Sequence, residues 1–202
     1  THSILADVLR NFSAEYPDVE LRIDEAYSGT LIDWVIAGDI DFAIVNSTRR
    51  KPGTSMVPLI DEELVLVQRA MPEPTATRMT FKKLAGFSLV LPSRRHGLRN
   101  IIEDAADEAG IRITPQIEID ALSPTLRLIS ESTLSAVLPD IVAHKSATEF
   151  PLHICRIVHP TLKRQLACVH RTDRPLAPIM STFIHKLKQE LHDGTIRRRI
   201  SR

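Results

Sequence analysis

Short apolar runs and helical stripes of apolar residues alternate along most of the chain. Val19, Leu21 and Ile23 alternate with charged residues, which predicts a strand with one polar face. The apolar run at 42–45 predicts a buried strand at 41–45. Between the two strands lies a short helical pattern at 31–37 that Gly38 ends. A strand, a helix and a strand within about thirty residues form the βαβ unit of a parallel sheet.

The same alternation restarts after a proline-containing loop at 71–77. Further strands are predicted at 64–67, 89–91, 117–119, 134–138, 154–158 and 166–169. Helices are predicted at 4–12, 81–84, 98–109, 124–131 and 180–191. Two α/β units in tandem, with ligand-binding loops at the ends of strands, are the architecture that this order predicts.

One strand-to-helix loop carries an unusual group of cations. The apolar run Leu89–Leu91 leads through Ser93, Arg94, Arg95 and His96 into the helix that begins near Gly97. The start of a helix presents free N–H groups, and its dipole favours negative charge. Cations there oppose the dipole, so helix stability does not explain them. Either they are ordinary surface charges or they help to hold a small anion.

Composition narrows the class of protein. The 202 residues are 43% hydrophobic and carry a formal net charge of +1, so no overall field points to nucleic acid or membrane. We expect no membrane contact, because the sequence has no apolar run of transmembrane length and no signal peptide at Thr1. Two cysteines are too few for a disulfide scaffold and indicate a reducing compartment. These features predict a soluble, cytoplasmic protein.

Candidate chemistry is sparse. The sequence has no GxSxG, GxxxxGK[ST] or GxGxxG motif. The spacing of His153, Cys155, His159, Cys168 and His170 matches no compact zinc site. We therefore expect no catalytic residue, metal or cofactor. An arginine-rich end (Arg197, Arg198, Arg199 and Arg202) is interpreted as a frayed, solvated terminus, with a contact to phosphate as the alternative.

Several segments together carry a resemblance to a known family. They are 16–19, 38–44, 58–67, 118–122, 138–139 and 170–178. Their order and spacing resemble the effector-binding domain of LysR-type transcriptional regulators, and 91–99 further resembles the nitrogen-assimilation-control branch. A solute-binding protein of a transporter and an enzyme are the alternatives, and the first of them shares the fold.

The resemblance implies an α/β fold of two Rossmann-like lobes joined by two crossover segments, like type 2 periplasmic binding proteins. Lobe I would comprise 1–68 plus 170–202 and lobe II 69–169, with crossovers near Val67 and Val169. It further implies a homodimer, and a tetramer in the full-length protein. The helix at 4–12 with the strand at 19–23 would meet the partner's helix at 98–109, unless these apolar stripes are satisfied within one chain. DNA would be bound only through an N-terminal helix-turn-helix domain absent from this chain.

The resemblance also implies a small-molecule effector, for which the cationic loop favours an anion. The residues expected to bind it are Ser28, Ser93, Arg94, His96, Gly97, Leu98, Arg99, Leu122 and Ser123. Ser93, Arg94 and Arg99 would anchor the anion, while Leu98 and Leu122 would supply apolar contact. The alternative is that both arginines pair with acidic residues such as Glu103, four residues after Arg99.

One segment departs from the family pattern. Ser132-Thr133-Leu134 stand where the family commonly has Gly-x-Gly. Glycine often ends a helix in the left-handed conformation, which costs other residues roughly 1 kcal/mol. We therefore expect a different turn after Glu131.

Overall fold

The computed structural model describes residues 2–46, 50–72 and 76–200, with side chains for 4–46, 50–72 and 76–193. By contact the chain separates into two compact units, Thr1–Asp61 with Gln165–Arg202 (unit 1) and Glu62–Arg164 (unit 2). Two strands, β2 (Thr54–Arg69) and β8 (Lys163–Arg171), have residues in both units. The lobe limits expected from the sequence differ from these by a few residues and stay a prediction.

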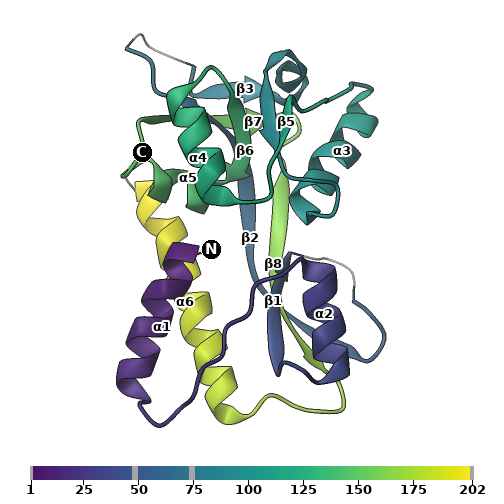
Figure 1. Ribbon diagram of the computed structural model, residues 1–202, viewed down its shortest axis with the longest axis vertical. Helices are drawn as coiled ribbons and strands as arrows, with labels where there is room; N and C mark the ends of the chain where they lie inside the picture. Colours follow the sequence, from purple (N-terminus) through teal and green to yellow (C-terminus); the bar gives the residue numbers. More distant parts are fainter. Residues whose placement is uncertain (1, 47–49, 73–75, 201–202) are drawn as a thin grey trace. The chain divides into compact units, whose positions relative to one another are not determined.

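Unit 1 combines three helices with the first part of β2, the last part of β8 and one further strand. These elements are α1 (His2–Glu15), α2 (Ser28–Ala37), β1 (Phe42–Asn46) and α6 (Pro178–Ile200). β1 pairs antiparallel with β8, so that Phe42 lies opposite His170. The apolar face of α2 packs on this pair through Ile32 and Val35 (Figure 1). Gly38 ends α2 in the left-handed conformation at φ 84°, as the sequence predicts.

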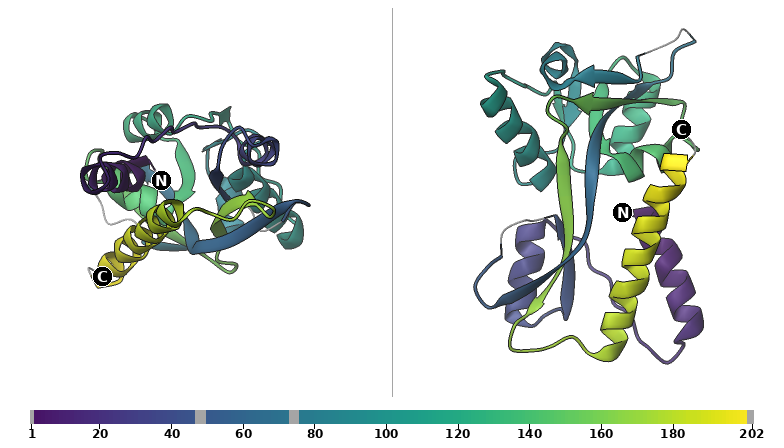
Figure 2. Two further views of the ribbon diagram at one scale, coloured as in Figure 1. Left: turned by 90° about the horizontal axis from the view of Figure 1, so that it is seen from below. Right: turned by 180° about the vertical axis from the view of Figure 1, so that it is seen from behind.

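The two longer helices of unit 1 pack against each other (Figure 2). Phe12 of α1 meets Phe183 of α6 edge to face, with ring centroids 5.1 Å apart. Lys186 of α6 donates to Glu15 of α1 at 2.7 Å. The apolar stripes at 4–12 and 180–191 are thus satisfied partly within this unit. Arg202 and the side chains of Arg197, Arg198 and Arg199 lie outside the described residues.

The strand expected at 19–23 is wrong: this segment has no strand pairing in the described part of the chain. Val19 and Leu21 are half-buried, whereas Ile23 keeps 53% of its surface exposed. Alternation reports which face of a segment is covered, but a strand also needs a neighbouring backbone to hydrogen-bond. The alternation thus agrees with the burial of Val19 and Leu21, but not with the exposure of Ile23 or with the absence of strand pairing in these described residues.

Unit 2 is built on a mixed sheet. In its described residues the strand order is β3, β7, β2, β6, β4, β5, in which β3–β7, β6–β4 and β4–β5 are parallel. The new strands are β3 (Arg78–Thr80), β4 (Leu89–Leu91), β5 (Ile117–Glu118), β6 (Ser135–Pro139) and β7 (Leu152–Val158). The helices are the 3-10 helix η1 (Phe81–Gly86), α3 (Gly97–Ala109), α4 (Leu122–Glu131) and α5 (Asp140–Ser146). Among these, β3 and α5 were not expected from the sequence.

Helices cover both faces of this sheet because the stretch Leu64–Val67 of β2 and the strand β4 are apolar at every position. Along β2, Leu64 and Leu66 pack on the face that holds α3 and η1. Val65 and Val67 pack on the opposite face, which holds α4 (Figure 1). A short continuous apolar run is what a strand covered on both faces requires. No helix of the described chain is long and apolar enough to cross a membrane.

At the end of α4, Ser132-Thr133-Leu134 form the turn for which the family commonly uses Gly-x-Gly. Ser132 follows the helix in an extended conformation, with φ −136° and ψ −174°. Its hydroxyl donates to the Leu128 carbonyl at 2.6 Å and accepts from Leu134 N at 3.2 Å. The side chain of Ser132 thereby satisfies groups that a left-handed glycine turn satisfies with its own backbone.

Candidate functional site

The candidate site of unit 2 lies at the carboxyl ends of two adjacent parallel strands. Leu91 at the end of β4 is in register with Glu118 at the end of β5. β4 leads into α3 on one face of the sheet, and β5 leads into α4 on the other face. Where neighbouring parallel strands send their helices to opposite faces, the loops separate and leave room for a ligand. Both helix N-termini therefore begin at one edge of the sheet.

The β4–α3 loop is fixed by its own backbone and by a histidine cap. His96 N donates to the Ser93 carbonyl at 3.0 Å, and Arg99 N donates to the His96 carbonyl at 2.9 Å. The Nδ1 atom of His96 accepts a hydrogen bond from Leu98 N at 3.2 Å, which caps the first turn of α3. A capping acceptor must be unprotonated, so His96 does this as the neutral imidazole.

The environment of His96 keeps it neutral. Burial lowers the pKa of the imidazole, the Arg164 guanidinium lowers it further, and the Asp120 carboxylate opposes both. Arg164 is itself buried and donates through Nε and Nη2 to Oε2 of Glu62, at 2.9 and 2.7 Å. The second oxygen of Glu62 accepts from Ile141 N at 2.9 Å. A buried ion pair, in which both carboxylate oxygens of Glu62 accept hydrogen bonds, thus lies near the cap of α3.

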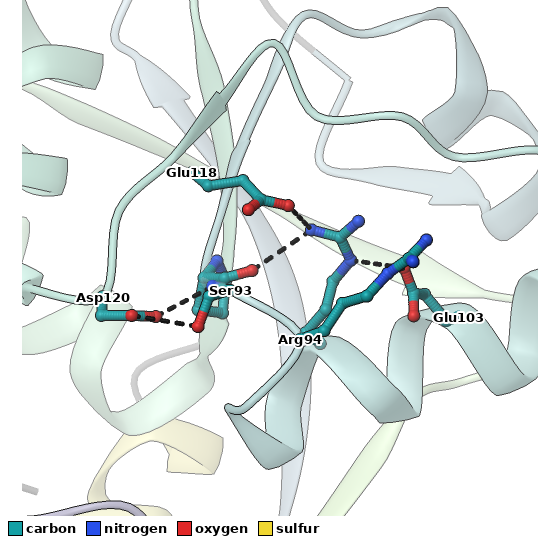
Figure 3. A network of polar contacts seen from close by, with 7 residues as sticks. Ser93, Arg94, Glu103, Glu118 and Asp120 are labelled. Carbon is teal, nitrogen blue, oxygen red and sulfur yellow. Dashed lines mark hydrogen bonds and ion pairs between the residues drawn. The ribbon is translucent and has the colours of Figure 1, made fainter.

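Ser93 forms hydrogen bonds with Asp120 of the neighbouring β5–α4 loop. Its N–H donates to Oδ1 of Asp120 at 2.8 Å, and its hydroxyl donates to Oδ2 at 3.0 Å (Figure 3). These are the two donors that the sequence offers to an anion, and here a carboxylate of the β5–α4 loop accepts both. Hydrogen bonds to a charged group contribute about 1.5–3 kcal/mol when shielded, and less where water competes as it does here.

Arg94 faces the carboxylate of Glu103 (Figure 3), and Arg99 also faces carboxylates. The Nε atoms of both arginines donate to Oε1 of Glu103, at 3.1 Å from Arg94 and 2.9 Å from Arg99. Arg99 Nη1 also donates to Oε1 of Glu118 at 3.0 Å and to the Pro92 carbonyl at 3.2 Å. Burial alone raises the pKa of Glu103, but the two arginines outweigh it and the pKa falls below its usual value. The alternative weighed from the sequence, pairing with Glu103, is the arrangement in the structure.

The other residues expected to bind the effector differ in their exposure to solvent. Leu98 is buried in the core beneath α3, and Gly97 is half-buried at the first position of that helix. At the start of α4, Leu122 is half-buried and Ser123 is exposed, and the N-cap Ala121 has no side-chain capping bond. Uncapped N–H groups at a helix start are free to meet a ligand.

Ser28 belongs to unit 1. It is the first residue of α2, and its hydroxyl accepts from Asn46 N at the end of β1, at 3.2 Å. The buried Nδ2 atom of Asn46 finds no acceptor in the described part of the chain. A buried donor without an acceptor is uncommon in folded proteins.

The sequence reasoning missed the acidic members of the site. Glu118 and Asp120 accept from the cationic loop, and Arg164 lies near its histidine cap. A signal for the two carboxylates existed, because they flank the end of one predicted strand and the cationic loop follows another. Carboxyl ends of parallel strands meet at one edge, so these loops had to be neighbours if the strands were. Nothing in the sequence indicated Arg164.

The lowered pKa of His96 predicts that the stability of the domain depends on pH. The unfolded chain gains a proton near pH 6.5, the ordinary value, while folded His96 does so only at lower pH. The free energy of unfolding therefore falls as pH falls from about 6.5 toward the folded pKa, and is unaffected above it. His96→Asn keeps a capping acceptor and does not titrate. In urea unfolding at pH 7 and pH 5, we expect the wild type to lose more stability than the variant. Equal losses would contradict this assignment.

Solved structures share this fold. A mutant of OxyR from Corynebacterium glutamicum superposes with a TM-score of 0.81 at 24% identity, over 95% of this chain and 60% of that one. The effector-binding domain of QuiR in complex with shikimate superposes with a TM-score of 0.75 at 18% identity, over 92% of this chain and 88% of that one.

Curated relatives are transcriptional regulators. The hydrogen peroxide-inducible genes activator of Haemophilus influenzae is 22% identical over 174 residues, which are 86% of this chain and 58% of that protein. Across the relatives at the head of the comparison, this chain spans between 54% and 61% of their length. These names favour a regulator over a transporter's solute-binding protein, while the nitrogen-assimilation branch stays a prediction.

The LysR substrate binding domain, as a family, matches residues 1–192. The match covers both units, and the fold agrees with the type 2 periplasmic-binding-protein-like architecture expected from the resemblance. This chain therefore belongs to the LysR family, as the effector-binding domain of a LysR-type transcriptional regulator.

Proposed function

We propose that this domain senses a small anionic effector in the cytoplasm and thereby modulates DNA binding by a helix-turn-helix domain outside this chain. The observation that carries the proposal is the start of α3 and of α4 at one edge of the unit 2 sheet. Two helix N-termini offer free N–H groups and the positive ends of two dipoles. No enzymatic step is proposed, because the residues at this edge are bonded to one another in structural pairs.

The source of anion affinity differs from the one that the sequence suggested. Arg94 and Arg99 are each already paired with a carboxylate. We propose that the effector is instead held by the N–H groups at Gly97 and Leu122 and by the hydroxyl of Ser123, while Ser93 positions its loop through its bonds to Asp120. Leu98 and Arg99 are buried beneath this surface, and the part of Ser28, which belongs to unit 1, stays an expectation from the sequence. The relative solved with shikimate binds a small hydroxylated carboxylic acid, which fits such a set of donors.

The effector proposal is tested by a thermal-shift screen of small carboxylic acids, shikimate among them, against their neutral esters or amides. We expect acids to stabilise the domain and neutral analogues not to. In titrations, Ser123→Ala should weaken binding by about three- to tenfold, because it removes one hydrogen bond to the effector. Ser93→Ala should weaken binding by no more than that, because it removes the hydroxyl's bond to Asp120, which positions the loop. Arg94→Ala is the control and should stay within about twofold, since an exposed ion pair contributes little. Stabilisation by neutral analogues alone would contradict an anion site.

We also propose a homodimer in which α1 and the segment 19–23 of one copy meet α3 of the other. Ile23 supports this surface, because it is 53% exposed although its neighbours in the alternation are half-buried. Ile23→Asp should raise the dimer dissociation constant at least about tenfold in sedimentation, since a charge would be buried. Ile36→Asp is the control: that residue of α2 is 41% exposed and lies outside the proposed surface. Equal effects of the two changes, or a monomer throughout, would rule out this interface.

The cysteines of this chain are unsuited to thiol-based sensing of peroxide, although one relative is named a hydrogen peroxide-inducible genes activator. Cys155 and Cys168 are both buried; burial raises the pKa of Cys155 and raises that of Cys168 to about 12. The thiolate is the reactive form, and at a pKa of about 12 only roughly one Cys168 in 10⁵ is ionised at pH 7. We expect DTNB to react slowly with the native domain and rapidly in urea. Fast labelling of the native domain would contradict this.

A further inference from the structure

Arg99 is the least exposed charged residue of the candidate site, with 3% of its side chain accessible. Its guanidinium donates to atoms of three different elements. Nε reaches Glu103 within α3 at 2.9 Å, while Nη1 reaches Glu118 of β5 at 3.0 Å and the Pro92 carbonyl after β4 at 3.2 Å. With Nε and Nη1 bonded to these neighbours and 3% of the side chain accessible, Arg99 offers little surface to an effector.

Local stability does not account for a cation at this position. Arg99 stands in the first turn of α3, where the helix dipole is unfavourable to positive charge. Burying a guanidinium is costly unless carboxylates or carbonyls accept all of its hydrogen bonds. A buried position facing the core beneath α3 would suit an apolar residue at least as well. What the arginine adds is a physical link among the ends of β4 and β5 and the start of α3.

We infer that Arg99 is the positioning residue of the effector site, holding the β4–α3 loop and the β5–α4 loop at a fixed separation. The identity of the site rests on the proposed function, but the linking role does not. The Ser93–Asp120 pair makes a second connection between the same two loops. Because the two helix N-termini follow directly from these loops, their spacing is set by the same bonds. A binder preorganised in this way loses less freedom when the ligand arrives.

The contacts of Arg99 differ in how replaceable they are. Glu103 keeps Arg94 as a partner at 3.1 Å when Arg99 is removed. Glu118 is 51% exposed, and its described ion pair is with Arg99. The link to β5 is therefore the one that depends on Arg99, whereas the link within α3 is duplicated. Loss of Arg99 should free the loops and leave α3 in place.

The inference is tested on the 202-residue chain by amide hydrogen exchange without any ligand. Arg99→Met removes the guanidinium at similar length, and Glu118→Ala removes its acceptor at a half-exposed position that tolerates truncation. Arg127→Met is the matched control, because Arg127 pairs with Glu131 on the exposed face of α4 at 3.4 Å. In both test variants we expect amides at 93–98 and 119–122 to exchange about tenfold faster. Amides at 64–67 in β2 should change by less than about twofold, as should all of these segments in the control.

Arg99→Lys separates geometry from charge. A lysine retains the charge but lacks the fork that reaches two acceptors in different directions, so loop exchange should stay fast. The inference is overturned if Arg99→Met and Glu118→Ala leave the loops as protected as in the wild type. It is equally overturned if exchange rises uniformly through unit 2, or if Arg99→Lys restores full protection. None of these readouts uses an effector, so a failed acid screen would leave the inference standing, and the converse holds as well.

Discussion

The parallel pairing of β4 with β5 is the constraint on which the candidate site depends. It brings two strand ends to one edge of the unit 2 sheet, in register at Leu91 and Glu118. Each strand must be followed by a helix that covers an apolar face, and the two helices take opposite faces. The loops consequently diverge above the strand ends, and two helix N-termini are left together. The apolar composition of the strands thus produces the polar site, because both faces need a helix.

Electrostatic balance decides how such a site can bind. The cations near the start of α3 oppose its dipole, and carboxylates from α3 and from β5 pair with them. The carboxylate of the β5–α4 loop accepts from Ser93. Ion pairs of this kind hold the loops but leave little free positive charge. Affinity for an anion then has to come from backbone N–H groups and hydroxyls, which are directional. Selectivity would accordingly depend on the shape of the ligand as well as on its charge.

Much of the fold could be predicted from periodicity. Continuous apolar runs such as Leu64–Val67 and Leu89–Leu91 became central strands, and Gly38 and Gly110 end helices in the left-handed conformation. The segment at 19–23 failed because alternation shows burial and not hydrogen-bond pairing. α5 was missed because Pro139, interpreted as the end of a strand, is also its N-cap. Such features depend on which segments become neighbours in space.

The site was harder to predict than the fold for the same reason. The sequence located the loop at Ser93–Arg99, yet it could not show that Asp120 accepts from Ser93, which needs the register of β4 and β5. It also could not show that Arg99 is buried while Arg94 is 77% exposed, because both are arginines of one short segment. Ser132 illustrates the same limit, since its capping role depends on a hydroxyl that bonds two backbone groups.

The most direct test of the account is an NMR titration of the ¹⁵N-labelled domain with shikimate, or with the acid that stabilises it best. The account predicts that the largest amide shifts in unit 2 fall at 93–98, the β4–α3 loop with the start of α3, and at 122, 123 and 125 in the first turn of α4, where Pro124 has no amide. Each N–H that bonds the carboxylate should move downfield. The neutral ester should leave these amides unmoved. Saturable shifts confined to other segments, with 93–98 and 122–125 unchanged, would contradict the placement of the effector site at the carboxyl ends of β4 and β5.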